Sequence, residues 1–142
     1  MLTLISTGEQ PTGDELPRFS CRSVPKAGCV HVVPQGELDI ATVPHLDRSL
    51  RIAREAEEDV VLDLRELEFI DSSGGHLLVA ADRRIRESGG RLLVFLGSGE
   101  VAWLLQLLGI DRMLEVIDSL ETETATVHAW TRPALRSPLS AC

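Results

Sequence analysis

Runs of apolar residues alternate with stretches of helical periodicity along most of this chain. The segment Asp59–Leu64 is rich in β-branched residues and nearly all apolar, which predicts a strand buried on both faces. Arg91–Leu96 repeats that pattern and predicts a second such strand. The segment between them predicts an amphipathic helix from about Gly74 that stops at Ser88–Gly90, because four apolar residues recur at helical spacing: Leu77, Leu78, Ala81 and Ile85.

A hairpin and a helix are predicted before the first of these strands. Val30–Val33 and Glu37–Ile40 are strand-like segments separated by the turn residues Pro34–Gly36, which favours an antiparallel hairpin. Thr42 is a suitable N-cap for a helix that ends at about Ala56. The apolar positions of this helix repeat every three or four residues: Val43, Leu46, Leu50 and Ala53.

The C-terminal part of the chain predicts two further helices around a short strand. Ser98 is the expected N-cap of the first helix, and Gly109 is placed to end it. Met113–Ile117 predicts the strand, and Asp118 has capping-box spacing to Glu121 for a final helix through about Ala129. The apolar stripe of the first helix falls at i, i+3, i+4 and i+7: Val101, Leu104, Leu105 and Leu108.

This order of elements predicts a single α/β domain with one mixed sheet of about five strands, about four helices and an opening hairpin. A chain of 142 residues suits one domain. We expect the domain to span residues 28–130. Residues 1–27 and 131–142 are expected to be irregular tails because they hold most of the prolines without a sustained period, although a strand over Phe19–Val24 is an alternative.

Charge and cysteine usage narrow the possible functions. The formal net charge is -8, which disfavours direct binding to nucleic acid. Three scattered cysteines without a CxxC pair predict neither a metal site nor a disulfide framework, and they favour a reduced, cytoplasmic setting. No apolar run approaches the roughly 20 residues of a membrane span, and no export signal is expected. We expect no cofactor.

The segment Glu68–Gly75 (EFIDSSGG) joins the first buried strand to the following helix. Leu67, Phe69 and Ile70 are expected to anchor it to the core. Its two hydroxyls, next to a carboxylate and at the start of a helix, suit either an anion position or simple helix capping. A serine hydrolase is a minor alternative, because the chain has no GxSxG pentapeptide and none of its four histidines can be assigned to the serines: His31, His45, His76 and His128.

The run VVLDLRELEFIDSSGG, followed by LLVAADRRIRESGGRLLV, resembles the bacterial anti-sigma factor antagonists of the STAS class. The resemblance covers about Cys29–Val127 and includes GELD (Gly36–Asp39) and LLQLLGIDRMLEV. It implies a cytoplasmic non-enzyme, a monomer or weak dimer. Such a protein binds an anti-sigma factor, often a serine kinase, when unphosphorylated, and thereby releases a sigma factor for transcription. An alternative within the class is an accessory subunit of a membrane transport system.

The resemblance also implies roles for single residues. The second serine of the pair, Ser73, is the expected site of phosphorylation by the partner kinase, and Ser72 is the second choice. One position departs from the family pattern: Gly75 stands where a leucine or a similar apolar residue is usual, which predicts a looser first helical turn. The residues expected to contact the partner are Asp39, Asp71, Ser72, Ser73, Gly74 and Gly75.

Overall fold

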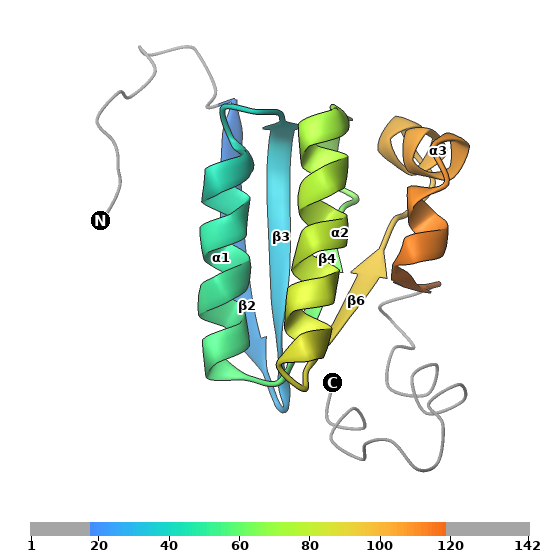
Figure 1. Cartoon of the computed structure of the whole chain (residues 1–142). Coiled ribbons are helices and arrows are strands. Elements are labelled where there is room, and N and C mark those ends of the chain that lie inside the picture. Colours follow the sequence, from blue (N-terminus) through green and yellow to red (C-terminus); the bar gives the residue numbers. More distant parts are fainter. Residues whose placement is uncertain (1–17, 119–142) are drawn as a thin grey trace, which may run out of the picture.

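A mixed six-stranded sheet runs through residues 18–118, the part of the chain that the computed structural model describes (Figure 1). Its order is β2-β3-β4-β6-β7, and β5 pairs with β3 off this path. β2 is antiparallel to β3, and all other pairs are parallel. The strands are β2 (Phe19–Lys26), β3 (Cys29–Leu38), β4 (Asp59–Asp63), β5 (Leu67–Ile70), β6 (Arg91–Phe95) and β7 (Glu115–Ile117). The predicted fold class is confirmed, with β2 and β5 as strands beyond the predicted set.

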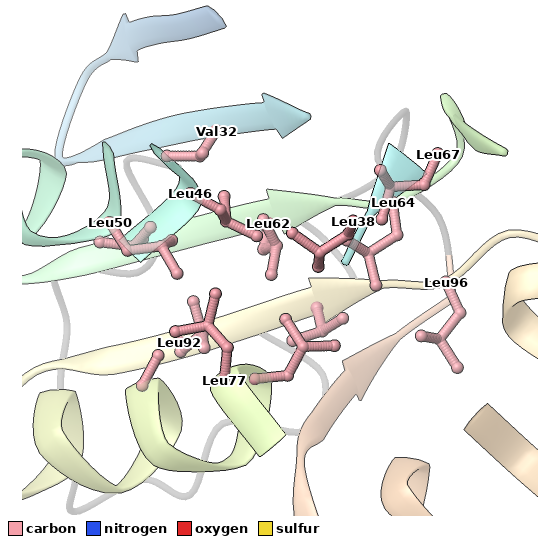
Figure 2. Close-up of a cluster of buried hydrophobic side chains, with 14 of the residues drawn as sticks. Val32, Leu38, Leu46, Leu50, Leu62, Leu64, Leu67, Leu77, Leu92 and Leu96 are labelled. Carbon is pink, nitrogen blue, oxygen red and sulfur yellow. The ribbon is translucent and has the colours of Figure 1, made fainter. Parts of the chain in front are cut away.

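Two long helices lie side by side over one face of this sheet (Figure 1). They are α1 (Val43–Ala56) and α2 (Ser72–Glu87). Both bury the predicted apolar stripe; Leu46 and Leu50 of α1 and Leu78 of α2 are fully buried. Figure 2 shows Leu46 and Leu50 together with leucines of the strands in one cluster of apolar side chains. Burial of these stripes, at roughly 25 cal/mol per Å², is the main force that holds the helices on the sheet.

The hairpin lies earlier in the chain than the sequence predicted. β3 continues through Pro34, and the turn is formed by Ala27–Gly28, where Gly28 has a φ of 85°. Pro34 is tolerated because the β4 pairing ends at Val32 and the β5 pairing begins at Gly36, so its missing N–H costs no bond on that side. Gly36 marks a register shift that bends the strand instead of reversing it.

The first 27 residues therefore are not irregular throughout, since they contain the edge strand β2. This strand extends the alternative at Phe19–Val24 by two residues. Another difference lies between β4 and α2, where the chain forms β5 along β3 in place of a continuous loop. Leu67 and Ile70 are buried as expected, whereas Phe69 is 48% exposed. Helix α2 begins at Ser72, two residues before the predicted start.

The last described part contains α3 (Glu100–Leu107), the 3-10 helix η1 (Ile110–Met113) and β7. Gly99, not Ser98, is the N-cap of α3, and it makes no side-chain cap bond. Gly109 follows the helix with a φ of 77°, as its placement after the helix predicted. The predicted helix from Asp118 to Ala129 falls outside the described residues. No helix between residues 18 and 118 is long and apolar enough to cross a membrane.

Candidate functional site

The ends of two parallel strands bring the predicted site residues together. Leu38 at the end of β3 pairs with Ile70 at the end of β5, and the backbone N–H of Asp71 donates to the Leu38 carbonyl at 3.1 Å. Asp39 and the segment Asp71–Gly75 therefore lie at one edge of the sheet. In Figure 1 this edge is at the top, where the β3 arrow ends beside the first turn of α2. We call it the serine edge.

Asp71 caps α2 without help from the two serines. Its side-chain Oδ1 accepts the backbone N–H of Gly74 at 3.1 Å, a cap of a kind that contributes about 1 kcal/mol. Ser72 is exposed and Ser73 is half-buried, both in the first helical turn. Within residues 18–118 neither serine hydroxyl makes a hydrogen bond. The capping interpretation of this segment therefore holds for Asp71 alone.

The two glycines after the serines are buried at close contacts. A Cβ added at Gly74 would lie 2.7 Å from Cγ1 of Ile70 and 3.0 Å from Cδ2 of Leu38. One added at Gly75 would lie 2.7 Å from Cδ1 of Ile110 in η1. The Ile110 side chain thus occupies the space that an apolar side chain at position 75 would enter. The first turn stays closed, since the Gly75 N–H donates to the Asp71 carbonyl at 3.0 Å.

Asp39 is held in the turn between β3 and α1. Its Oδ1 accepts the backbone N–H groups of Ala41 at 3.0 Å and Thr42 at 3.1 Å, and its Oδ2 pairs with the Arg18 guanidinium. Desolvation raises the pKa of Asp39, but these hydrogen bonds and the charge of Arg18 lower it by more, so the pKa lies below its usual value. The carboxylate stays ionised at neutral pH and shapes the serine edge next to Asp71.

A groove of about 490 Å³ begins at Ser72 and runs between α2 and η1. Its walls are mostly apolar, and the basic side chains that line it are His76 and Arg83. Leu108 and Met113, which line it, are 56% and 54% exposed. The described residues that line it are Ser72, His76, Val79, Ala80, Arg83, Leu108, Ile110 and Met113.

Large exposed apolar side chains gather around the serine edge, and sequence reasoning missed most of them. Ile40 follows β3, Phe69 lies near the end of β5, and Trp103 borders a second groove beside Phe69. Phe69 was expected in the core. The sequence pattern did not single out Trp103, because the predicted apolar stripe of α3 ran through other positions. Exposed apolar surface of this kind is typical of protein interaction sites.

The histidines do not form a hydrolase site with the serines in the described part of the chain. His31 is buried in β3, His45 stacks on Phe19 with ring centroids 6.1 Å apart, and His76 lies in the groove beside Ser72 without a hydrogen bond to it. His128 is outside the described residues. Among residues 18–118 no group of three or more His, Cys, Asp or Glu side chains could hold a metal ion.

The chain matches one family model, and it is similar to known proteins in sequence and in structure. The family model described as "STAS domain" matches residues 23–123. An anti-sigma-B factor antagonist of Staphylococcus aureus is 27% identical over 89 residues, which cover 62% of this chain and 82% of that protein. An anti-sigma factor antagonist from Mycobacterium paratuberculosis has a similar structure, with a TM-score of 0.66 at 21% identity over 78% of this chain and 92% of that one.

SpoIIAA, an anti-sigma factor antagonist, is also similar in structure. Its unphosphorylated form has a TM-score of 0.60 at 22% identity and covers 80% of this chain and 99% of its own. The phosphorylated Bacillus form has a TM-score of 0.52 at 24% identity and covers 75% and 96%. At these identities the structural likeness shows a shared fold.

Proposed function

This chain belongs to the STAS domain family, and from that premise we propose that it is an anti-sigma factor antagonist switched by phosphorylation of Ser73. The names of its relatives support the first part and describe regulators, so the prediction that the chain is not an enzyme is confirmed. The observation that carries the second part is the Ser73 hydroxyl, which no structural hydrogen bond engages within residues 18–118. The existence of an unphosphorylated and a phosphorylated form of SpoIIAA also supports a switch by phosphorylation.

In the unphosphorylated state the serine edge binds an anti-sigma factor and so frees a sigma factor for transcription. Asp71, Ser72, Ser73 and the paired glycines supply the polar centre of this surface, and Asp39 fixes the neighbouring turn. When the partner is a kinase, it supplies the nucleotide and the metal ion, and Ser73 supplies only the attacking hydroxyl. The chain then needs no catalytic residue of its own.

Phosphorylation is expected to change binding more than folding. A phosphoryl group adds about -1.5 to -2 charges at the first turn of α2, where the helix dipole contributes about 0.3 to 1 kcal/mol of stabilisation. In a docked complex the same dianion would lie beside the Asp71 carboxylate and against a partner surface that fits a neutral hydroxyl. An unpaired charge at an interface costs several kcal/mol, and each 1.4 kcal/mol is a tenfold loss of affinity.

Labelling and binding together test this proposal. The cognate kinase and ATP should label Ser73, as read by mass spectrometry of the α2 peptide. Ser73→Ala should abolish labelling and keep binding, whereas Ser73→Asp should weaken binding at least about tenfold in calorimetry, with little change in stability. Ser72→Ala is the matched control for labelling, and it should still be phosphorylated at Ser73. Label on Ser72 alone would move the site by one residue, and full affinity of the phosphorylated form would contradict the switch.

The partner itself is found by affinity capture from the native cell, with mass spectrometry of what is retained. Recovery of an anti-sigma factor from the soluble fraction supports the proposal and a cytoplasmic location. Recovery of a membrane transport complex would favour the accessory-subunit alternative instead. Sedimentation of the purified chain alone checks our expectation of a monomer or weak dimer.

A further inference from the structure

The second groove at the serine edge has aromatic walls, and we call it the aromatic groove. It has a volume of about 330 Å³ and lies between β5 and α3. Phe69 is 48% exposed and Trp103 is 61% exposed, although removing either ring from water would be favourable. Seven of the described residues line it: Glu68, Phe69, Ile70, Glu100, Val101, Trp103 and Leu104.

The charges in this groove have one sign. Among the described residues, only Glu68 and Glu100 are ionisable and line this groove, and no cation between residues 18 and 118 pairs with either of them. Other carboxylates nearby are engaged: Glu66 with Arg22, and Asp39 with Arg18. An apolar slot between two free carboxylates is complementary to an apolar side chain that has lysine or arginine as neighbours.

This charge pattern selects among the possible occupants. A second copy of the chain would bring its own carboxylates to the same place, because a twofold interface uses the same patch on both partners. It would also carry the same net charge of -8. The anionic surface of a membrane is disfavoured for the same reason. A basic amphipathic segment of another protein matches both the apolar walls and the free carboxylates.

We propose that the aromatic groove binds a basic amphipathic segment of the anti-sigma factor, with Phe69 and Trp103 as the main anchors. The inference rests on the proposed function and adds a second contact to it. Ile70 lines the groove, and Asp71 and the serines follow it directly, so a segment in the groove would continue onto the first turn of α2. The groove supplies affinity, and Ser73 decides whether the neighbouring contact is tolerated.

The experiment uses the anti-sigma factor that the wild-type chain captures, purified and titrated calorimetrically. Trp103→Ala and Phe69→Ala should each weaken binding at least about tenfold, as anchors of an interface do. Ile52→Ala is the matched control, because Ile52 is 54% exposed on α1 and is absent from the lining of both grooves at the serine edge. Phe69 is 48% exposed and Trp103 is 61% exposed, so each variant should keep a melting temperature close to that of the wild type.

Fluorescence and salt give two further readouts. The chain has two tryptophans, so Trp130→Phe leaves Trp103 as the single emitter. Its emission should move to shorter wavelength, and its quenching by acrylamide should fall, when the anti-sigma factor is added. Glu68→Gln with Glu100→Gln should slow association and reduce its salt dependence, because the steering charges are gone.

The outcomes separate the two proposals. If the wild-type chain binds an anti-sigma factor while Trp103→Ala binds as well as Ile52→Ala, and the Trp103 emission stays unchanged, the groove is not part of the interface and the proposed function stands. If the wild type binds no anti-sigma factor, the proposed function fails and this inference fails with it. A change of oligomeric state in Trp103→Ala without the partner would overturn the choice of occupant in favour of a second copy.

Discussion

Adjacent glycines at the start of α2 allow a paired test of how the serine edge is packed. Gly74 and Gly75 are both buried in the first turn, but the atoms that an added methyl would meet differ. At Gly74 these atoms belong to Ile70 and Leu38, whose side chains are 2% and 0% exposed. At Gly75 the nearest atom is the terminal methyl of Ile110, in a partly buried residue of η1. The buried side chains of Ile70 and Leu38 have no free space to move into, whereas the partly buried side chain of Ile110 can change rotamer.

The expected magnitude follows from two opposing terms. Replacing glycine by alanine in a helix gains up to about 1 kcal/mol, and this term is nearly common to both sites. Overpacking a tight core costs typically about 1 to 3 kcal/mol. Gly75→Ala should therefore be neutral or slightly stabilising. Gly74→Ala should be less stable than Gly75→Ala by at least about 1 kcal/mol, or roughly 4 to 8 °C in a domain of this size.

Urea denaturation followed by circular dichroism measures both variants against the wild type. Because the two sites are neighbours in one helix, differences in helix propensity and unfolded-state entropy largely cancel in the comparison. Equal stability of the two alanine variants would refute the reasoning, since it would mean that Leu38 and Ile70 do not confine α2. A strong loss of stability in Gly75→Ala alone would show instead that η1 is the rigid neighbour.

Three further predictions concern stability. Leu78→Ala should cost about 2 to 5 kcal/mol because Leu78 is fully buried, and Leu104→Ala should cost less because Leu104 is only partly buried; urea titrations compare them. A chain that starts at residue 18 should melt like the wild type in calorimetry, whereas one that starts at residue 28 loses β2 and should melt lower. Burial raises the pKa of Asp63, but the hydrogen bonds and the charge of Arg65 lower it by more, so the pKa lies below its usual value. Asp63→Asn should therefore be less stable than the wild type at pH 7. The difference in unfolding free energy should narrow as the pH falls below about 4.

Sequence patterns were sufficient where burial is continuous. The predicted strands around β4 and β6 and the predicted limits of α1 agree with the structure, because apolar runs and a regular stripe leave little choice of face. β2 escaped the pattern because most of its residues are exposed on an edge. β5 escaped it because four residues with two exposed positions in the middle have no clear alternation. Both strands are specified by their partner β3 more than by their own residues.

The polar part of the site was predictable from sequence and the apolar part was not. The motif Asp71–Gly75 marked a segment that the structure places beside Asp39, and the roles that the resemblance implies for these residues stay predictions. In α3, however, nearly every residue is apolar, so the spacing cannot tell which face is buried. The predicted stripe included Leu108, which lies after the helix and is exposed, while Ala102 is buried. The excess of large apolar residues in α3 was itself a signal of an exposed apolar surface, because an eight-residue helix cannot bury all of its large side chains.

Under the proposed function, different residues of the segment Asp71–Gly75 hold the fold and carry the switch. Asp71 satisfies the helix end, and the glycines let α2 approach β3, β5 and η1. The Ser73 hydroxyl makes no hydrogen bond within residues 18–118, so a phosphoryl group there would remove no cap. A single modification can then act almost entirely on the surface where a partner lies. Ile70, one residue before the cap, also lines the aromatic groove, so we expect a partner segment in that groove to lie next to a phosphorylated Ser73.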